Sequence, residues 1–528
     1  MINSTVVIFL GLYFIVILGI GAWTVRRGVA KNLEGYLLGG RKAGPLVTAL
    51  TLQSTSMSGY MFLGAGSLGY AQGYWALWYA AGDIGGGVLN LSVIGRRMRK
   101  FSQLMGALTA IEYLEKRYPS PVIRLIAGSL TVFLLGCYVL AQFIAGGKGL
   151  ALISGLPYPL TLFISITVIL TYTYLGGYLA VAYTDTFQSM VMLVGVLWIL
   201  IAVLFELGGL GAANRMLSEL DPTLLSVWGK NLIYENQWGI VIGAVLVFSI
   251  GYMGWPHVVT RHMAMRSPRT ARLSGAYATL WNLFFVPAPY LIGILALLIL
   301  PTLDDPELAI FRVAEQLLPA AVTGIVLAAI MAAIMSTADS LLLQTGSIAA
   351  RDLYQRFVDP AASEQRMVWI ARALILMIGM VGYAVALIEP PTIFAIVLFA
   401  TSVLGSAFLP AYVCAVWWEK ANAAGALTSM IVGAGVAFAW ELAGLAESTT
   451  VHSMLAGIVS STTTMIAVSL LTQRLNPVPP HIIATMQSAA QHNACSKQLT
   501  AKSDASLAIE AIEVKDMINS NKDNGKQK

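Results

Sequence analysis

The feature that most constrains this chain is a series of about thirteen apolar stretches, each long enough to cross a lipid bilayer. They predict an all-α polytopic membrane protein whose transmembrane helices lie near residues 6–25, 43–68, 73–95, 122–150, 157–180, 184–207, 237–260, 274–301, 319–350, 367–388, 391–417, 423–445 and 451–472. Composition agrees, because only 11% of the residues are charged, against about 25% in soluble domains. A soluble enzyme is therefore excluded.

Two of these spans are interrupted near their middle, at 53–59 (Gln-Ser-Thr-Ser-Met-Ser-Gly) and at 251–257 (Gly-Tyr-Met-Gly-Trp-Pro-His). A helix breaks inside hydrocarbon only where its freed backbone groups line a cavity or bind something. Each interruption lies in the first span of a block of five, and five is odd, so the second block enters the membrane from the opposite side. We therefore expect a five-plus-five inverted-repeat transporter core with a site near the membrane midplane.

The net positive charge of the chain is confined to short loops and to the C-terminal tail. Basic residues gather at 26–42, 96–100 and 261–272, whereas the connections at 304–307 and 389–391 are acidic or nearly neutral. The positive-inside rule then predicts a multi-pass protein of the cell (inner) membrane with its N-terminus outside and its C-terminus in the cytoplasm. The net charge of +6 gives no support for nucleic-acid binding. The spacing of the three cysteines and five histidines suggests neither a disulfide framework nor a zinc site.

The spans divide the chain into five parts. We expect a first helix with a basic cytoplasmic loop (1–42), a first inverted repeat (43–207), an external loop and second repeat (208–417), two additional helices (418–472) and a polar tail (473–528). The tail is rich in Pro, Ser, Asn and Lys and cannot bury a core, so we expect it to be cytoplasmic, with a short amphipathic helix near Ser506–Met517.

The ninth span carries a small, hydroxylated face. Ala333, Ser336, Thr337 and Ser340 follow an i, i+3, i+4, i+7 spacing, so they share one side of a helix. Such a face can offer oxygens to an alkali cation, or it can form a packing seam of small residues whose hydroxyls bond their own helix. Asp339 favours the functional interpretation, because a carboxylate within a membrane span is costly and usually functional.

A series of short motifs makes the sequence recognisable. They are Gly39-Gly40-Arg41, Thr48-Ala49-Leu50, Ser56-Met57-Ser58-Gly59, Gly176-Gly177, Thr184-Asp185-Thr186-Phe187-Gln188, Gly251-Tyr252-Met253-Gly254, Pro256-His257 and Met335-Ser336-Thr337. In this order and spacing the sequence resembles the sodium/solute symporter family over roughly residues 5–472. It is most similar to the sodium/proline and sodium/pantothenate branches. The Gly-Tyr-x-Gly-x-Pro-His run favours the first, while residues 417–422 and 425–427 resemble the second.

The resemblance implies a sodium site at the first helix break. Its ligands would be backbone carbonyls matching Ser54, Met57 and Ala333 together with the hydroxyls of Ser336 and Thr337. Some members of the family hold a second sodium ion, which here implies a site near Asp185, Ser336, Asp339 and Ser340. Taken by itself, Asp185 could equally be an interfacial residue that caps the next helix.

Substrate is expected beside the two breaks, where aromatic walls and a few polar groups give the usual composition of a small-molecule pocket. The candidate residues are Ser58, Tyr138, Gln142, Phe248, Tyr252 and Pro256. Tyr138, Tyr252 and Pro256 resemble positions that line the substrate cavity of the proline branch. Two departures affect substrate identity: Ser56 replaces an aspartate and Trp255 replaces a glutamine typical of that branch. Each aromatic residue could instead face lipid, and Asp83 is interpreted as a buried, hydrogen-bonded polar residue.

We predict a sodium-coupled secondary active symporter, without enzymatic activity, that imports a small carboxylate-bearing solute by alternating access. A proline-like amino acid is favoured, and sodium/pantothenate or other organic-acid symport is the alternative. Proton coupling through Asp185 and Asp339 stays open. A membrane solute sensor would need a signalling domain, for which a tail of about 55 residues is too short. A channel would need pore-lining rings from several subunits rather than an asymmetric inverted repeat, and the sequence has no filter-like segment. We expect this chain to work as a monomer in the lipid bilayer.

Overall fold

The computed structural model describes residues 4–26, 32–388 and 393–490. The helix expected near Ser506–Met517 and the connection at 389–391 lie outside these residues. The chain divides into two compact units, Met1–Val478 and Pro479–Lys528. In the described part of the second unit, residues 480–490 form one helix. In the described part of the first unit the regular elements are helices, with one isolated bridge between Ala43 and Met265, so the all-α prediction is confirmed.

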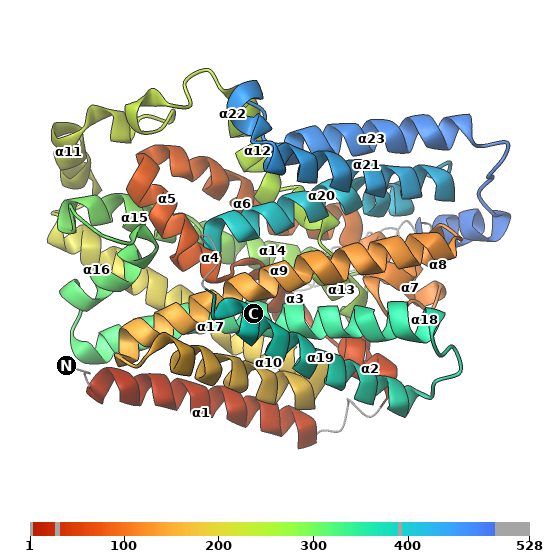
Figure 1. Ribbon diagram of the computed structural model, residues 1–528, viewed down its shortest axis with the longest axis horizontal. Helices are drawn as coiled ribbons and strands as arrows, with labels where there is room; N and C mark the ends of the chain where they lie inside the picture. Colours follow the sequence, from red (N-terminus) through yellow and green to blue (C-terminus); the bar gives the residue numbers. More distant parts are fainter. Residues whose placement is uncertain (1–3, 27–31, 389–392, 491–528) are drawn as a thin grey trace, which may run out of the picture. The chain divides into compact units, whose positions relative to one another are not determined.

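The principal helices of the first unit follow in chain order (Figure 1). They are α1 (Ser4–Arg26), α2 (Leu33–Leu38), α3 (Pro45–Ser56), α4 (Gly59–Phe62), α5 (Gly64–Gln72), α6 (Leu77–Asn90), α7 (Arg96–Leu104), α8 (Ala110–Arg117), α9 (Pro121–Ser154), α10 (Tyr158–Glu206), α11 (Leu210–Leu220), α12 (Trp238–Phe248), α13 (Pro256–Ala264), α14 (Thr270–Phe285), α15 (Pro287–Ile299), α16 (Ala309–Leu317), α17 (Ala320–Ile348), α18 (Gln355–Phe357), α19 (Glu364–Ala386), α20 (Ile393–Trp417), α21 (Ala423–Leu442), α22 (Leu445–Thr449) and α23 (Ser453–Leu471).

Nine helical stretches within the described residues are long and apolar enough to cross a membrane. They are Thr5–Arg26, Pro121–Leu152, Gly176–Glu206, Thr270–Ile299, Ala320–Phe357, Glu364–Ala386, Ile393–Trp417, Ala423–Leu442 and Ser453–Leu471. The other expected spans fall on shorter helices. Span 43–68 is divided among α3, α4 and α5, and span 237–260 between α12 and α13, while α10 changes direction at Gly177, where φ is 59°. A total of thirteen spans stays a prediction.

Helix α17 forms the centre of the first unit. Every residue from Val326 to Ile348 is buried, so this helix has no side left for lipid. It packs against α1, α9, α10 and α19, and its polar residues therefore face other helices. The outer helices differ, because α1 and α19 expose large apolar side chains such as Ile15, Met380 and Val381. That distribution is expected when lipid is the solvent of the outer surface.

Arg117, a basic residue between two expected spans, is a buried structural group. Arg117 is 1% exposed, and its guanidinium donates to the carbonyls of Ala415 (3.1 Å), Trp418 (2.9 Å) and Ala421 (3.0 Å). These carbonyls belong to the last turn of α20 and to the segment directly after it, where backbone acceptors lack partners within the helix. The planar guanidinium therefore ties α8 to the end of α20.

Candidate functional site

Both predicted helix breaks are confirmed. Helix α3 ends at Ser56, and Met57 then leaves the helical region with φ −88° and ψ 75°. The chain resumes as α4 after Ser58, whose hydroxyl accepts a hydrogen bond of 3.1 Å from the backbone N–H of Tyr60. The freed carbonyls at the end of α3 therefore have no continuing helix to bond.

The second break separates α12 from α13. A short 3₁₀ turn at Gly251–Gly254 follows α12, and Trp255 is extended before Pro256 starts α13. Gly254 is needed here because a Cβ atom on it would lie 2.8 Å from the Cα atom of Gly405 in α20. The two backbones thus cross in direct contact, and a larger side chain would force them apart.

A cluster of neutral oxygens lies where α17 crosses the first break. The Ser336 hydroxyl is 3.0 Å from the carbonyl oxygen of Ser54 and 3.2 Å from that of Ala333. The Thr337 hydroxyl donates to the carbonyls of Ser54 (3.3 Å) and Thr55 (3.1 Å). These residues are fully buried, and the buried Met57 adjoins them at the end of α3. Carbonyl and hydroxyl oxygens at a helix break are the ligands that transporters use for sodium.

Asp185 lies within α10 and is fully buried. Its Oδ2 atom accepts hydrogen bonds from the hydroxyls of Thr51 (2.5 Å), Thr55 (3.3 Å) and Ser340 (3.4 Å). The alternative that Asp185 caps a helix at the membrane boundary is therefore wrong, because its partners come from α3 and α17. The structure brings Asp185 and Ser340 together as expected for one polar cluster.

Arg261 is the main residue of the site that the sequence did not reveal. We counted it with a cytoplasmic basic loop, but it lies in α13 and is 3% exposed. Its Nη2 atom is 2.5 Å from the hydroxyls of both Thr55 and Ser340 and 3.5 Å from Asp185 Oδ2. Its Nη1 atom donates to the carbonyl of His257, one helical turn earlier (2.6 Å). The sequence contained one signal for this position: Arg261 is four residues after His257 of the predicted break, so a helix would place both on one face.

Asp339 makes none of these hydrogen bonds. It is fully buried in α17, and neither of its carboxylate oxygens has a hydrogen-bond partner among the described residues. The hydroxyl of Tyr172 and the Oε1 atom of Gln188, both on α10, are buried without partners as well. Buried polar groups normally find partners, and the contacts within the described residues leave these atoms on two packed helices unsatisfied.

The six residues expected to bind substrate are buried beside the breaks. Gln142 Oε1 accepts a bond of 3.0 Å from the N–H of Gly59, while its Nε2 atom has no partner in the described chain. Phe248 stacks on Tyr60 with ring centres 4.9 Å apart and lies 6.3 Å from Tyr252. The others, Ser58, Tyr138 and Pro256, belong to the cap of α4, the middle of α9 and the first turn of α13.

Asp83 joins this group. The Tyr252 hydroxyl donates to Asp83 Oδ1, so the interpretation of Asp83 as a buried, hydrogen-bonded residue is confirmed. Its second oxygen, Oδ2, is buried without a partner among the described residues. A carboxylate of this kind can accept a hydrogen bond from a positively charged ligand group.

Comparison with known proteins matches this chain to a family of transporters. The sequence profile described as "Sodium:solute symporter family" matches residues 36–433. The osmoregulated proline transporter OpuE of Bacillus subtilis (strain 168) is 31% identical over 476 residues, which cover 89% of this chain and 95% of that protein. The sodium/proline symporter of Staphylococcus aureus (strain JH9) is 30% identical over 489 residues, covering 89% and 94% of the two chains.

Two solved structures share the fold. A Na⁺-coupled sialic acid symporter in a substrate-bound outward-open state superposes with a TM-score of 0.74 at 17% identity, covering 90% of this chain and 98% of that one. MhsT in complex with L-phenylalanine superposes with a TM-score of 0.51, also at 17% identity, covering 81% and 98%. At such identities the likeness extends to the fold alone.

Proposed function

Because the chain belongs to the sodium:solute symporter family, we propose that it couples sodium movement across the membrane to the import of a small carboxylate-bearing solute, with proline or a similar amino acid as the leading substrate. The observation that carries the coupling is the contact of Ser336 and Thr337 with the carbonyls at the end of α3. The family and the relatives named above are transporters, so chemistry on the solute is not part of this proposal.

The neutral cluster is proposed to hold one sodium ion. Its ligands would be the carbonyls of Ser54, Met57 and Ala333 and the hydroxyls of Ser336 and Thr337. These hydroxyls now donate to the carbonyls, and they would turn their lone pairs toward a bound ion. Since the carbonyls belong to α3 and the hydroxyls to α17, the ion would join the two helices, which links sodium binding to a change in their packing.

The substrate is proposed to lie between the two breaks. Its carboxylate would face the start of a half-helix, where the helix dipole favours negative charge. Its ammonium group would bind Asp83 Oδ2, which is buried without a partner in the described chain. Phe248, Tyr138 and Tyr252 would enclose the apolar body. Asp83 thereby gives a reason to prefer an amino acid over pantothenate or another organic acid, which have no ammonium group.

Proton coupling is the second candidate, and Asp339 is the observation that favours it. Both of its oxygens are buried and unpaired in the described chain, which is the setting in which a carboxyl group takes up a proton. The alternative for Asp339, with Asp185 and Ser340, is a second sodium ion.

We also propose a functional monomer with the N-terminus outside, the C-terminus in the cytoplasm and the two inverted repeats at 43–207 and 208–417.

Uptake into proteoliposomes tests the function. Radiolabelled proline uptake would be measured under a sodium gradient alone and a proton gradient alone, with excess proline, pantothenate, short monocarboxylates or galactose as competitors. We expect uptake with sodium alone and competition by proline, and Tyr252→Ala should weaken the apparent affinity. Uptake driven by protons alone would contradict sodium coupling. Absence of saturable proline uptake under the sodium gradient would contradict the solute class, and an unchanged affinity in Tyr252→Ala would contradict the position of the pocket.

A further inference from the structure

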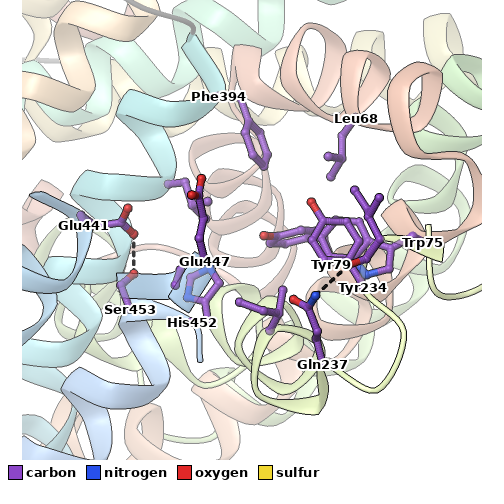
Figure 2. A pocket seen from close by; sticks show the side chains of 14 residues that line it. Leu68, Trp75, Tyr79, Tyr234, Gln237, Phe394, Glu441, Glu447, His452 and Ser453 are labelled. Carbon is purple, nitrogen blue, oxygen red and sulfur yellow. Dashed lines mark hydrogen bonds between the residues drawn. The ribbon is translucent and has the colours of Figure 1, made fainter. Parts of the chain in front are cut away.

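Two cavities of this protein differ in the charge of their walls. One, of about 440 Å³, lies at helix ends that are external in the proposed orientation, and Figure 2 shows Glu441 and Glu447 among its side chains. A smaller cavity, of about 150 Å³, has no acidic side chain among the described residues that line it. Its lining consists of Arg124, Arg351, Gln355, Arg356 and Pro360. The smaller cavity therefore suits an anion.

The basic cavity lies where α9 begins and where the chain leaves α17. Arg124 is in the first turn of α9, Arg351 is in the π-helical segment Ala349–Tyr354 that follows α17, and Arg356 is in α18. In the proposed orientation these are cytoplasmic ends of helices. The described lining includes none of the residues proposed to bind sodium or the solute, so this cavity is a separate feature.

Carboxylates outside the lining fix two of these arginines. Arg124 Nε is 2.8 Å from Asp352 Oδ1, and its Nη1 atom is 2.8 Å from Glu115 Oε2. Arg351 bonds both oxygens of Glu112, at 3.0 Å from Nη2 to Oε1 and 3.4 Å from Nε to Oε2. Because the guanidinium groups are already held in place, a ligand would lose little affinity to the ordering of their side chains.

The ion pairs leave N–H groups available to a ligand. Arg356 contacts Glu115 Oε1 through Nε and Nη2, at 2.9 Å each, and its Nη1 atom has no hydrogen-bond partner among the described residues. Arg351 and Arg124 each use three of the five donors of a guanidinium. With Lys116 the group has four cations against three carboxylates. An oxyanion can therefore bind without breaking an ion pair.

Exposed apolar residues adjoin these arginines in the sequence. Val122 and Leu125 near the start of α9 are exposed, as are Phe357 and Val358 directly after Arg356, with Val358 at 68%. Exposed apolar side chains of a membrane protein face acyl chains, and basic pockets at cytoplasmic helix ends bind lipid headgroups. The volume of the cavity is several times the roughly 30 Å³ of a water molecule, which leaves room for a phosphate group.

From this arrangement we propose that the basic cavity binds the phosphate group of an anionic phospholipid of the cytoplasmic leaflet. The unused N–H groups of Arg124, Arg351 and Arg356 donate to the phosphate oxygens, and the exposed apolar residues contact the acyl chains. The headgroup thereby joins the start of α9 to the segment that follows α17. The leaflet follows from the proposed orientation, whereas binding itself does not depend on which solute or ion the protein carries.

Native mass spectrometry of the delipidated full-length protein in detergent tests this site. We expect short-chain phosphatidylglycerol to form a saturable adduct of one lipid per protein, and phosphatidylcholine, which has no net charge, to bind more weakly. Arg351→Gln/Arg356→Gln should weaken the phosphatidylglycerol adduct about tenfold or more, because charge-assisted hydrogen bonds are lost. Arg356→Gln alone keeps the pairs of Arg124 and Arg351 and should weaken it several-fold.

Arg366→Gln is the matched control. Arg366 is also exposed and paired, with Asp359 at 2.9 Å, and it reaches the hydroxyl of Tyr354 at 3.5 Å, but it does not line the cavity. Its substitution should leave lipid binding unchanged.

Three results would overturn the proposal. One is equal affinity for phosphatidylglycerol in the wild type, Arg356→Gln and the double variant. Another is an equal loss in Arg366→Gln, which would show attraction to surface charge in general. The third is binding of inorganic phosphate that depends on Arg351 and Arg356 without any lipid adduct, which would make the cavity a site for a free anion.

Competition between inorganic phosphate and the lipid would support the oxyanion chemistry of the site.

Discussion

The two polar clusters at the first helix break are adjacent but opposite in character. One consists of neutral oxygens, with Ser336 and Thr337 bonded to carbonyls of α3. The other contains a full ion pair between Asp185 and Arg261. Thr55 belongs to both, because its carbonyl accepts from Thr337 while its side chain contacts Asp185 and Arg261. The neutral cluster can bind and release a cation, whereas the charged cluster already contains a cation, the Arg261 guanidinium.

This difference concerns how many sodium ions move with each solute. Arg261 donates to the same two hydroxyls, of Thr55 and Ser340, that a sodium ion beside Asp185 would need. We therefore expect a second ion near Asp185 only when the guanidinium moves away. A buried pair also stabilises only while both partners remain, since the loss of one leaves an uncompensated charge.

The largest expected effect follows from breaking that pair. Arg261→Met leaves Asp185 buried without its partner, which should reduce stability by about 3–5 kcal/mol. Thermal unfolding followed by size-exclusion chromatography in sodium-free buffer would measure this. The double variant Arg261→Met/Asp185→Asn removes both charges and should recover most of the loss. A single variant as stable as the wild type would show that the pair does not hold α13 to α10.

The next effect concerns the neutral cluster. Thr337→Ala removes one proposed sodium ligand and should raise the sodium concentration for half-maximal uptake about tenfold or more. Thr345→Ala is the matched control, because Thr345 is also buried in α17 but its hydroxyl bonds the carbonyl of Leu341 in its own helix. Equal sodium dependence in both variants would remove Thr337 from the ion site.

A smaller effect is expected at Asp339. If Asp339 holds a further cation, Asp339→Asn should lower the sodium Hill coefficient toward one while transport continues. Parallel measurement of sodium and solute fluxes would give the ion-to-solute ratio. If the variant loses its response to a proton gradient instead, Asp339 carries a proton. An unchanged ratio together with an unchanged proton response would mean that Asp339 has only a structural role.

The smallest effect is expected at Ser340. Its hydroxyl contacts Asp185 and Arg261 but none of the carbonyls of the neutral cluster. Ser340→Ala should therefore change half-saturation by sodium less than about twofold, because it removes none of the proposed ligands of the neutral cluster. An increase as large as that of Thr337→Ala would show that the two clusters form one sodium site.

The sequence predicted those parts of the site that depend on local pattern. The breaks at Met57–Ser58 and before Pro256 follow from residues that end helices, and the face of Ser336 and Thr337 follows from helical periodicity. The roles of Arg261 and Asp83 depend on partners far away in the chain. Arg261 meets Thr55 across 206 positions, and Tyr252 meets Asp83 across 169. Composition near a predicted span end made Arg261 resemble a loop residue, and only packing could show otherwise.

Helix α17 has a consequence for how the protein is made. Membrane helices insert first and associate afterwards, so α17 must initially contact lipid on every side. In the finished protein it contacts none between Val326 and Ile348, and Asp339 lies within that segment. Its neighbours α9 and α1 are made before it and α19 after it, so the hydroxyls proposed to hold sodium meet their carbonyl partners only during lateral assembly. Correct insertion and competence to transport are therefore separate stages in the biogenesis of this protein.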